Sequence, residues 1–311
     1  MTQNNDIRQA LNEQGGFQVW WRLLRPHTLT ASFIPVFFGT MAALYFHGEF
    51  NALLFLAMLL ASMLIQIATN MFNEYYDYVR GLDTEESVGI GGTIVRDGIA
   101  PKTVLNLAFT FFGIAILLGV YICLETTWWI AVIGLIGMLF GYLYTGGPLP
   151  IAYTPFGELF AGFLMGTVII CISYYIQVLD LTSDIIWLTI PIAIFIATIL
   201  LSNNIRDLDG DKKNGRKTIA ILLGRKKAIY FLALLFIIAY GFTAAFIILK
   251  MLPLESLIAF FSIKLAYDVI QKFKGKTEPI EMLPAMIATG KTNTAYGLLL
   301  GVSLLVSYFL A

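Results

Sequence analysis

Residues 203–218 read Asn-Asn-Ile-Arg-Asp-Leu-Asp-Gly-Asp-Lys-Lys-Asn-Gly-Arg-Lys-Thr, and this polar stretch decides how the rest of the chain is interpreted. It contains three aspartates and five basic side chains, and it follows directly on an apolar run in a chain that is 58% hydrophobic. Charged side chains are costly in a membrane-spanning helix, so a dense cluster at the end of one points to a function.

The pattern of an asparagine followed by an aspartate occurs once more, where an earlier apolar run ends. Asn73 and Asp77 have the same i, i+4 spacing as Asn203 and Asp207. On a helix this spacing places the amide and the carboxylate on one face, one turn apart. A further aspartate follows each pair: Asp83 and Asp211. Two such clusters, facing each other at the end of a bundle, would suit one or two divalent cations that hold a polyphosphate.

The composition is that of an integral membrane protein. Charged residues make up 13% of the 311 residues, whereas roughly 25% is usual in soluble domains. A span needs about 20 apolar residues, and a helix satisfies its own backbone in lipid. We therefore expect an all-α membrane protein, a single domain over 1–311 with a polar N-terminal tail at 1–16. The nine predicted transmembrane helices are 28–46, 52–76, 103–123, 127–145, 156–178, 185–204, 228–249, 252–272 and 293–310.

The positions of the Lys and Arg residues predict the orientation of this bundle. With nine spans, the N-terminal segment and the connections after the second, sixth and eighth spans lie on one side. Of the twenty Lys and Arg residues, only Lys250 and Lys264 lie outside these segments. Cytoplasmic connections carry an excess of Lys and Arg. We therefore expect the N-terminus and both aspartate clusters to form a polar cap in the cytoplasm.

Two further segments could bind phosphate. The sequence before the first span, residues 20–26, mixes tryptophan and arginine as interfacial anchors do; alternatively, Arg22 or Arg25 reaches a phosphate. Between the second and third spans, four glycines within residues 89–98 would let backbone amides approach an anion, and Arg96 adds a forked donor. Simple flexibility is the alternative for this glycine-rich connection.

Several other polar side chains lie in or near the predicted spans. Tyr142 and Tyr144 precede the Gly-Gly-Pro stop of the fourth span, and Glu158 lies at the start of the fifth. They could be interfacial tyrosines and a helix-capping acid, or they could contact a substrate. Lys264 and Asp268 form the one charged i, i+4 pair well inside a predicted span. Mutual neutralisation and a substrate role are both open for that pair.

These motifs together resemble a known family. NEYYDYVRGLD (73–83), NNIRDLDGDKKNGRKT (203–218), the nine spans and RPHTL (25–29) are similar to the UbiA-type intramembrane aromatic prenyltransferases. Three further segments, ESVGIGGTIVRDGIAP (86–101), YTGGP (144–148) and LPAMIATGKTN (283–293), are most similar to the branch that prenylates 1,4-dihydroxy-2-naphthoate in menaquinone biosynthesis. The resemblance covers nearly the whole chain and implies a bacterial cell-membrane enzyme.

The resemblance implies a Mg²⁺-dependent transfer of a polyprenyl group from polyprenyl diphosphate to 1,4-dihydroxy-2-naphthoate, with loss of CO2 and diphosphate, to give demethylmenaquinone. A diphosphate leaving group needs cations to take up its developing charge. Carboxylates supply the oxygen ligands that Mg²⁺ prefers, and Arg or Lys neutralises the remaining charge. The isoprenoid tail would lie in an apolar groove open to membrane lipid. No nucleic-acid partner is implied.

The family pattern also assigns roles to individual residues. The implied metal ligands are Asn73, Asp77, Asp83, Asp207 and Asp211. The implied substrate contacts are Asn73, Arg96, Asn204, Arg206, Lys217, Tyr144 and Glu158. The catalytic candidates are Asp77 and Asp207 at the leaving group, with Tyr142 and Lys264, besides Glu158, as groups that could activate the acceptor ring. Glu74 departs from the aspartate that commonly follows the first asparagine, and it is expected to be a second-tier ligand.

Two rival functions remain at this point. Another member of the family would use 4-hydroxybenzoate, homogentisate or haem as the acceptor. A secondary transporter would also gather polar groups within a helical bundle, but it would place them near the bilayer midplane. Both aspartate clusters instead lie at predicted helix ends on one side of the membrane, and this favours the enzyme.

Overall fold

The computed structural model describes residues 16–83 and 92–310, and within these ranges the chain is helical and contains no strand. In chain order the elements are α2 (Phe17–Leu24), η1 (Pro26–Thr28), α3 (Thr30–His47), α4 (Ala52–Val79), α5 (Thr93–Asp97), α6 (Pro101–Glu125), α7 (Trp129–Leu143), η2 (Ile151–Tyr153), α8 (Gly157–Ala161), η3 (Gly162–Val168), α9 (Ile169–Val178), α10 (Ser183–Leu188), α11 (Ile190–Arg206), α12 (Leu208–Lys213), α13 (Ile219–Leu223), α14 (Arg225–Ile248), η4 (Leu254–Ser262), α15 (Ile263–Phe273) and α16 (Pro279–Leu310). The predicted all-α class is confirmed.

Seven helical segments in the described part of the chain are long and apolar enough to cross a membrane. They correspond to seven of the nine predicted spans, so the protein is a multi-pass membrane protein. The other two predicted spans are helical but differ in character. Helix α7 has only 15 residues, and the eighth predicted span consists of the 3-10 helix η4 followed by α15.

The predicted start of the last span is wrong. Helix α16 begins at Pro279 and not at residue 293, so Lys291 lies within the helix and not in a connection. The polar residues before position 293 have partners inside the bundle. The Thr289 hydroxyl donates to the Ala285 carbonyl one turn earlier and contacts the Ser202 hydroxyl of α11 at 3.2 Å. Interhelical hydrogen bonds of this kind let polar residues continue a buried membrane helix.

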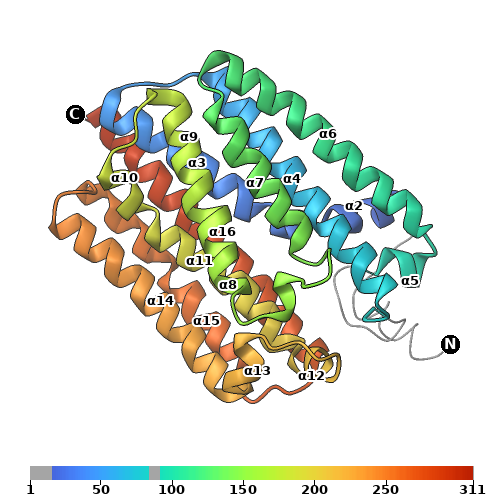
Figure 1. Cartoon of the computed structure of the whole chain (residues 1–311). Coiled ribbons are helices and arrows are strands. Elements are labelled where there is room, and N and C mark those ends of the chain that lie inside the picture. Colours follow the sequence, from blue (N-terminus) through green and yellow to red (C-terminus); the bar gives the residue numbers. More distant parts are fainter. Residues whose placement is uncertain (1–15, 84–91, 311) are drawn as a thin grey trace.

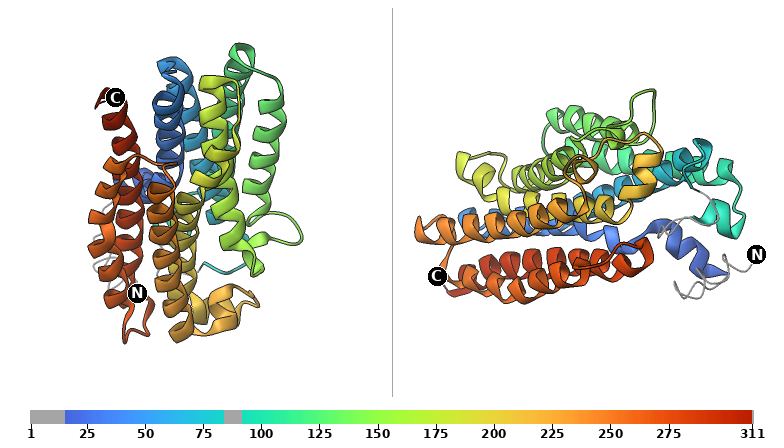
Figure 2. Two further views of the ribbon diagram at one scale, coloured as in Figure 1. Left: turned by 90° about the vertical axis from the view of Figure 1, so that its left-hand side faces the viewer. Right: turned by 90° about the horizontal axis from the view of Figure 1, so that it is seen from below.

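The long helices run roughly parallel and pack around α3 (Figures 1 and 2). Helix α3 lies against α9 on one side and against α16 on the other, while α4 packs along α6 and α11 packs along α14. The largest cluster of buried apolar side chains joins α3, α11, α14, α15 and α16. Two smaller clusters fill the spaces beside α4, α6 and α7. The first aspartate motif therefore ends one half of the bundle, and the second motif ends the other half.

Glycines allow the close approach of two of these helices. The spacing of Gly162 and Gly166 predicts a tight contact, and both lie in the π-helical segment η3 against α11. A Cβ at Gly162 would lie 2.6 Å from the Ala193 carbonyl oxygen, and one at Gly166 would lie 2.5 Å from the Ala193 Cα. The packing role expected for the glycines of this span, Gly157, Gly162 and Gly166, is therefore confirmed at Gly162 and Gly166. It is not confirmed at Gly157, where a Cβ would lie no closer than 3.5 Å to a neighbour.

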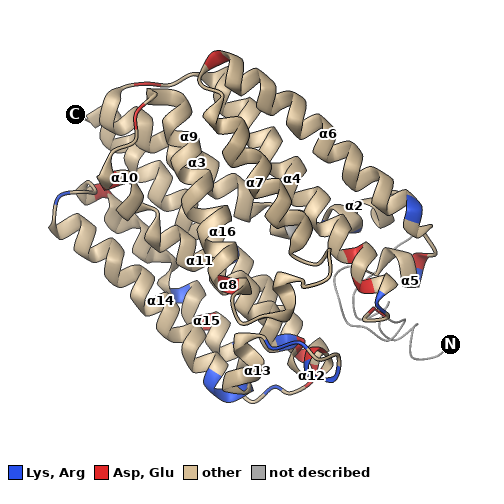
Figure 3. Ribbon diagram, viewed as in Figure 1, with Lys and Arg blue, Asp and Glu red and all other residues tan. Residues whose placement is uncertain are grey.

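Asp and Glu residues occur at both ends of the bundle, whereas most Lys and Arg residues gather at one end, around α5, α12 and α13 (Figure 3). The aspartate motifs end there because α4 and α11 both run toward that end (Figure 1). Lys264 lies apart from this end, exposed on α15 with the half-buried Asp268. No ion pair within 4.0 Å joins these two among the described residues, so mutual neutralisation, one of the two alternatives for this pair, is not observed.

The tight contact at Gly166 should limit stability. We expect Gly166→Val to lower the free energy of unfolding by about 1–3 kcal/mol, because the added side chain would overlap the α11 backbone. Gly113→Val is the matched control, since a Cβ at Gly113 meets nothing within 4 Å. Thermal unfolding of both variants in detergent micelles measures the difference. Equal melting temperatures would contradict the packing role.

Candidate active site

The two aspartate motifs meet through a single arginine. Arg216 donates to the Asp77 carboxylate at 2.8 Å and to the Asp211 carboxylate at 3.0 Å. Asp77 comes from the last turns of α4, whereas Asp211 comes from α12, which follows α11. All three side chains are at most 20% exposed. The structure therefore brings the two motifs together at one end of the bundle, as their spacing predicts.

The local fold explains why Arg216 reaches both acids. Gly215 has φ 78°, a left-handed turn that returns the chain after α12. The Arg216 amide then donates to the Asp211 carbonyl at 3.0 Å, and the guanidinium lies 5.2 Å from the centre of the Tyr153 ring. Burial alone would lower the pKa of Arg216, but the charges of Asp77 and Asp211 raise it above its ordinary value. Arg216 therefore remains a fixed cation.

Burial and neighbouring charges raise the pKa of two acids in this region, Asp83 and Asp211. Burial raises the pKa of Asp83 to about 7, and the Asp77 and Glu74 charges add to the effect. Burial likewise raises the pKa of Asp211 to about 6, against the opposing charge of Arg216. Crowded, partly desolvated carboxylates favour the protonated form unless a cation is added. A divalent cation at this place would restore the ionised form.

The donor set fits Mg²⁺ in chemistry, although the carboxylates do not form a closed cage. Within residues 16–83 and 92–310, no group of three or more His, Cys, Asp or Glu side chains is close enough to hold an ion. Asp207 is paired with Arg206 at 2.6 Å, and Asp77 and Asp211 share Arg216. Mg²⁺ is commonly held by one or two carboxylates, with substrate phosphates completing its shell. This open arrangement suits that mode of binding.

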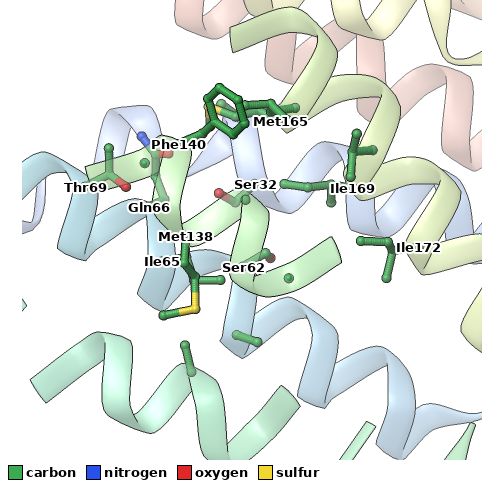
Figure 4. A pocket seen from close by; sticks show the side chains of 18 of the residues that line it. Ser32, Ser62, Ile65, Gln66, Thr69, Met138, Phe140, Met165, Ile169 and Ile172 are labelled. Carbon is green, nitrogen blue, oxygen red and sulfur yellow. The ribbon is translucent and has the colours of Figure 1, made fainter. Parts of the chain in front are cut away.

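A mostly apolar cavity of about 490 Å³ adjoins the motifs. Asn73 of α4 and Asn203 of α11 both line it, so the two motif asparagines face one space. Arg25 and Tyr144 also line it. Away from the motifs, side chains project into the cavity from α3, α4 and α7 and from η3 and α9 (Figure 4). The lining is therefore polar at Asn73 and Asn203 and largely apolar beyond them.

Helix α7 leaves space for this cavity. Its cavity-lining residues include Gly134, Gly137 and Gly141, and a Cβ at Gly134 or Gly137 would meet nothing within 4 Å. Gly141 differs, because a Cβ there would lie 2.7 Å from the Thr69 hydroxyl of α4. The missing side chains at Gly134 and Gly137 therefore widen the cavity beside α7.

The connection between α7 and α8 is held against the first motif. The Thr145 hydroxyl donates to the Asn73 side-chain oxygen at 2.7 Å. Arg80 donates to the Gly147 carbonyl at 2.8 Å and to the Thr145 carbonyl. Its guanidinium also lies over the Tyr76 and Tyr153 rings. These contacts place Tyr144 at the cavity, where burial raises its pKa above the ordinary value.

Some residues predicted for the site lie elsewhere. Lys264 does not line the cavity, and Lys217 is exposed, with its backbone amide bound to the Tyr153 carbonyl. Tyr142 turns away from the cavity, and its hydroxyl lies 2.6 Å from that of Tyr76.

The Asn204 amide donates to the buried Glu158 carboxylate at 2.8 Å. Neighbouring Asn203, and not Asn204, faces the cavity.

Arg96 and Arg206 remain beside the acids. Arg96 is buried in α5, and its guanidinium packs on Gly92, where a Cβ would lie 2.5 Å from Nη1. Its charge opposes the rise in the pKa of Asp83. Arg206 is buried, bound to Asp207 and in contact with the Met286 sulfur. The glycines at 89 and 91 lie outside the described residues, as does Arg8.

Sequence reasoning missed two residues of the site. Arg216 was one of five basic residues in the second motif, and nothing in their order indicates which one turns inward. Asn203 had a usable signal, because only Asn203 has the i, i+4 relation to Asp207 that Asn73 has to Asp77.

Paired amide and carboxylate groups at helix ends adjoin an apolar cavity within a multi-pass membrane bundle. This arrangement is that of an intramembrane enzyme with a polar site beside an apolar one. The model of the UbiA prenyltransferase family matches residues 32–279. The chain is 52% identical over 99% of both chains to the 1,4-dihydroxy-2-naphthoate octaprenyltransferase of Bacillus subtilis (strain 168), and 29% identical over 76% of this chain and 79% of the relative to the protein of that name from Haemophilus influenzae.

Solved structures show the same fold. A UbiA homolog from Aeropyrum pernix K1 matches with a TM-score of 0.67 at 16% identity, covering 91% of this chain and 98% of the other. A UbiA homolog from Archaeoglobus fulgidus, solved bound to GPP and Mg²⁺, matches with a TM-score of 0.62 over 91% of this chain and 99% of the other, also at 16% identity. The chain belongs to the UbiA prenyltransferase family.

The Arg216 bridge should be essential to the site. We expect Arg216→Gln to lower prenyl transfer by about 10²-fold or more, because the site loses a cation aimed at both motifs. Arg216→Lys should recover only part of the activity, since an ammonium cannot bind two carboxylates as a planar fork does. Initial rates with saturating substrates measure both. Exposed Lys213→Gln is the control, and an equal loss there would contradict a specific role for Arg216.

The open face of α7 provides a second test. We expect Gly137→Leu to fill part of the cavity and to raise the KM for a long polyprenyl diphosphate by about tenfold, a change of about 1.4 kcal/mol. The fold should tolerate it, because a Cβ at Gly137 meets nothing within 4 Å. Gly113→Leu on α6 is the control, because Gly113 is not among the residues that line the cavity. Unchanged KM for long and short donors would contradict the assignment of the cavity to the tail.

Proposed function

We propose that the protein transfers a polyprenyl group from polyprenyl diphosphate to 1,4-dihydroxy-2-naphthoate, with loss of CO2 and diphosphate, giving demethylmenaquinone. The observation that carries this proposal is the 52% identity, over 99% of both chains, to the Bacillus subtilis 1,4-dihydroxy-2-naphthoate octaprenyltransferase. The structure supports the donor half of the reaction through a charged site next to an apolar cavity.

The charged end of the bundle holds the diphosphate. Asp77, Asp83, Asp207 and Asp211, with Asn73, are the residues that would hold Mg²⁺. When bound, Mg²⁺ supplies positive charge that stabilises the departing diphosphate. Arg216 adds a fixed cation within reach of both motifs, and Arg96 and Arg206 contribute from either side. Preorganised charge of this kind stabilises a leaving group without reorganisation during the reaction.

The cavity holds the allylic carbon and the tail away from water. The Asn73 and Asn203 side chains lie where the polar headgroup gives way to apolar lining, so the bond that breaks lies beside them. Exclusion of water there prevents hydrolysis of the activated prenyl group. The acceptor ring approaches from the same space. Tyr144 lines this space, whereas Tyr142, Glu158 and Lys264 are not among its lining residues.

The finer topology is also part of this proposal. Helix α7 and the η4–α15 segment cross the membrane with the seven longer segments, giving nine crossings. Lys and Arg residues gather at the end that carries α5, α12 and α13 (Figure 3). By the positive-inside rule this end, with the N-terminus, faces the cytoplasm, where diphosphate substrates are made.

Purified protein tests the assignment directly. With a labelled polyprenyl diphosphate and Mg²⁺, we expect product with 1,4-dihydroxy-2-naphthoate and none with 4-hydroxybenzoate or homogentisate. Asp77→Ala should lower the rate by about 10²-fold or more, because it removes a proposed metal ligand. Asp184→Asn, an exposed acid on α10, is the control. Turnover of 4-hydroxybenzoate in place of the naphthoate would overturn the proposed acceptor, and full activity of Asp77→Ala would overturn the ligand role.

A further inference from the structure

Glu74 occupies the position next to Asn73 where a metal-binding acid is expected, but its carboxylate is used differently. One oxygen accepts from the Gly92 amide at 2.7 Å, from the Thr93 hydroxyl at 3.0 Å and from the Ile94 amide at 3.3 Å. The other accepts from Arg25 at 3.1 Å. Four donors match the roughly four lone-pair sites of a carboxylate, so little capacity remains for a metal ion.

The burial of Glu74 makes these bonds necessary. Its side chain is 1% exposed, and a buried carboxylate is tolerated only when it is paired and hydrogen-bonded. The three donors on one oxygen belong to the start of α5, so Glu74 caps that short helix from α4. Arg96 follows one turn later in α5. The contacts of Glu74 therefore hold the helix that carries Arg96.

The second oxygen of Glu74 holds Arg25 at the cavity. Arg25 lines the cavity, and its backbone has the left-handed φ of 51°, which is uncommon for a residue other than glycine. Its Nε is buried and has no hydrogen-bond partner in the described part of the chain. Arg22, in the preceding turn, pairs with Asp97 of α5 at 2.7 Å. One ion pair therefore joins α2 directly to α5. A second ion pair joins Arg25, at the end of α2, to Glu74 of α4, and Glu74 is in turn hydrogen-bonded to the start of α5.

We propose that Glu74 is a positioning residue: it aims the Arg25 guanidinium into the cavity and fixes the α5 turn that carries Arg96, and it is not a metal ligand. The Nε of Arg25 then serves an anionic oxygen of a substrate, either a phosphate of the donor or the carboxylate of the acceptor. The substrate contact of Arg25 rests on the proposed function, which it deepens. The role of Glu74 in holding α5 is independent of that function.

Steady-state kinetics of the full-length protein separate this role from metal binding. We expect Glu74→Gln and Glu74→Asp to raise one substrate KM by about tenfold, because a charge-assisted hydrogen bond is lost. The Mg²⁺ concentration for half-maximal rate should remain within about twofold. A rise in the donor KM identifies the phosphate, and a rise in the acceptor KM identifies the carboxylate. Glu125→Gln, at the end of α6, is the matched control.

A double-mutant cycle tests whether Glu74 acts through Arg25. If it does, Arg25→Gln added to Glu74→Gln should change the same KM little further, since neighbours that act as one unit are not additive. Thr93→Val removes one donor to Glu74 and retains the shape, so it should shift the same KM by less. This variant keeps the test available if Glu74→Gln fails to fold.

Hydrogen exchange gives a readout that needs no substrate. Amides of residues 92–97 should exchange faster in Glu74→Gln than in the wild type, while amides in α14 should be unchanged. The exchange experiment tests the role of Glu74 in holding α5 whatever the acceptor is. The proposal is overturned by a tenfold shift in the Mg²⁺ requirement at constant substrate KM, by additive effects in the cycle, or by a uniform loss of rate and protection with both KM values unchanged.

Discussion

The bridge from Arg216 to Asp77 and Asp211 is the interaction on which the polar end of the bundle depends. Asp77 ends a helix of the first half of the chain, and Asp211 follows a helix of the second half. Without a cation between them, two partly buried carboxylates would repel each other and favour protonation. The bridge joins two separate helix ends into one site. The clustered carboxylates require nearby positive charge, and in the proposed function a metal ion bound with the diphosphate would also supply it.

The membrane explains why this site is built at an end of the bundle. A polyprenyl diphosphate has an apolar tail that belongs in lipid and a headgroup that belongs in water. The cavity follows that division, with Asn73 and Asn203 at the junction and apolar side chains from α7, η3 and α9 beyond it. Small residues make the shape possible: Gly162 and Gly166 bring η3 close to α11, whereas Gly134 and Gly137 leave space along α7.

Much of the fold could be predicted from the sequence, because apolar length and helix-end chemistry are local signals. The all-helical membrane class, the family and the packing role of Gly162 and Gly166 are confirmed. The start of α16 was missed because Thr289 and its neighbours find partners on another helix. The choice of Arg216 and the use of Glu74 depend on turns and contacts between distant segments. Spacing alone does not encode those contacts, and the roles of the site residues stay predictions.

In the proposed function, both aspartate motifs bind one diphosphate. A double-mutant cycle with Asp77→Asn and Asp211→Asn tests this central claim most directly. Binding of a non-reactive polyprenyl thiodiphosphate in the presence of Mg²⁺ would be followed by isothermal titration calorimetry. If both motifs hold one ligand, the two changes should be coupled by about 1 kcal/mol or more, with the double variant binding little worse than either single one. Fully additive losses would show that the motifs act independently and would contradict a shared site.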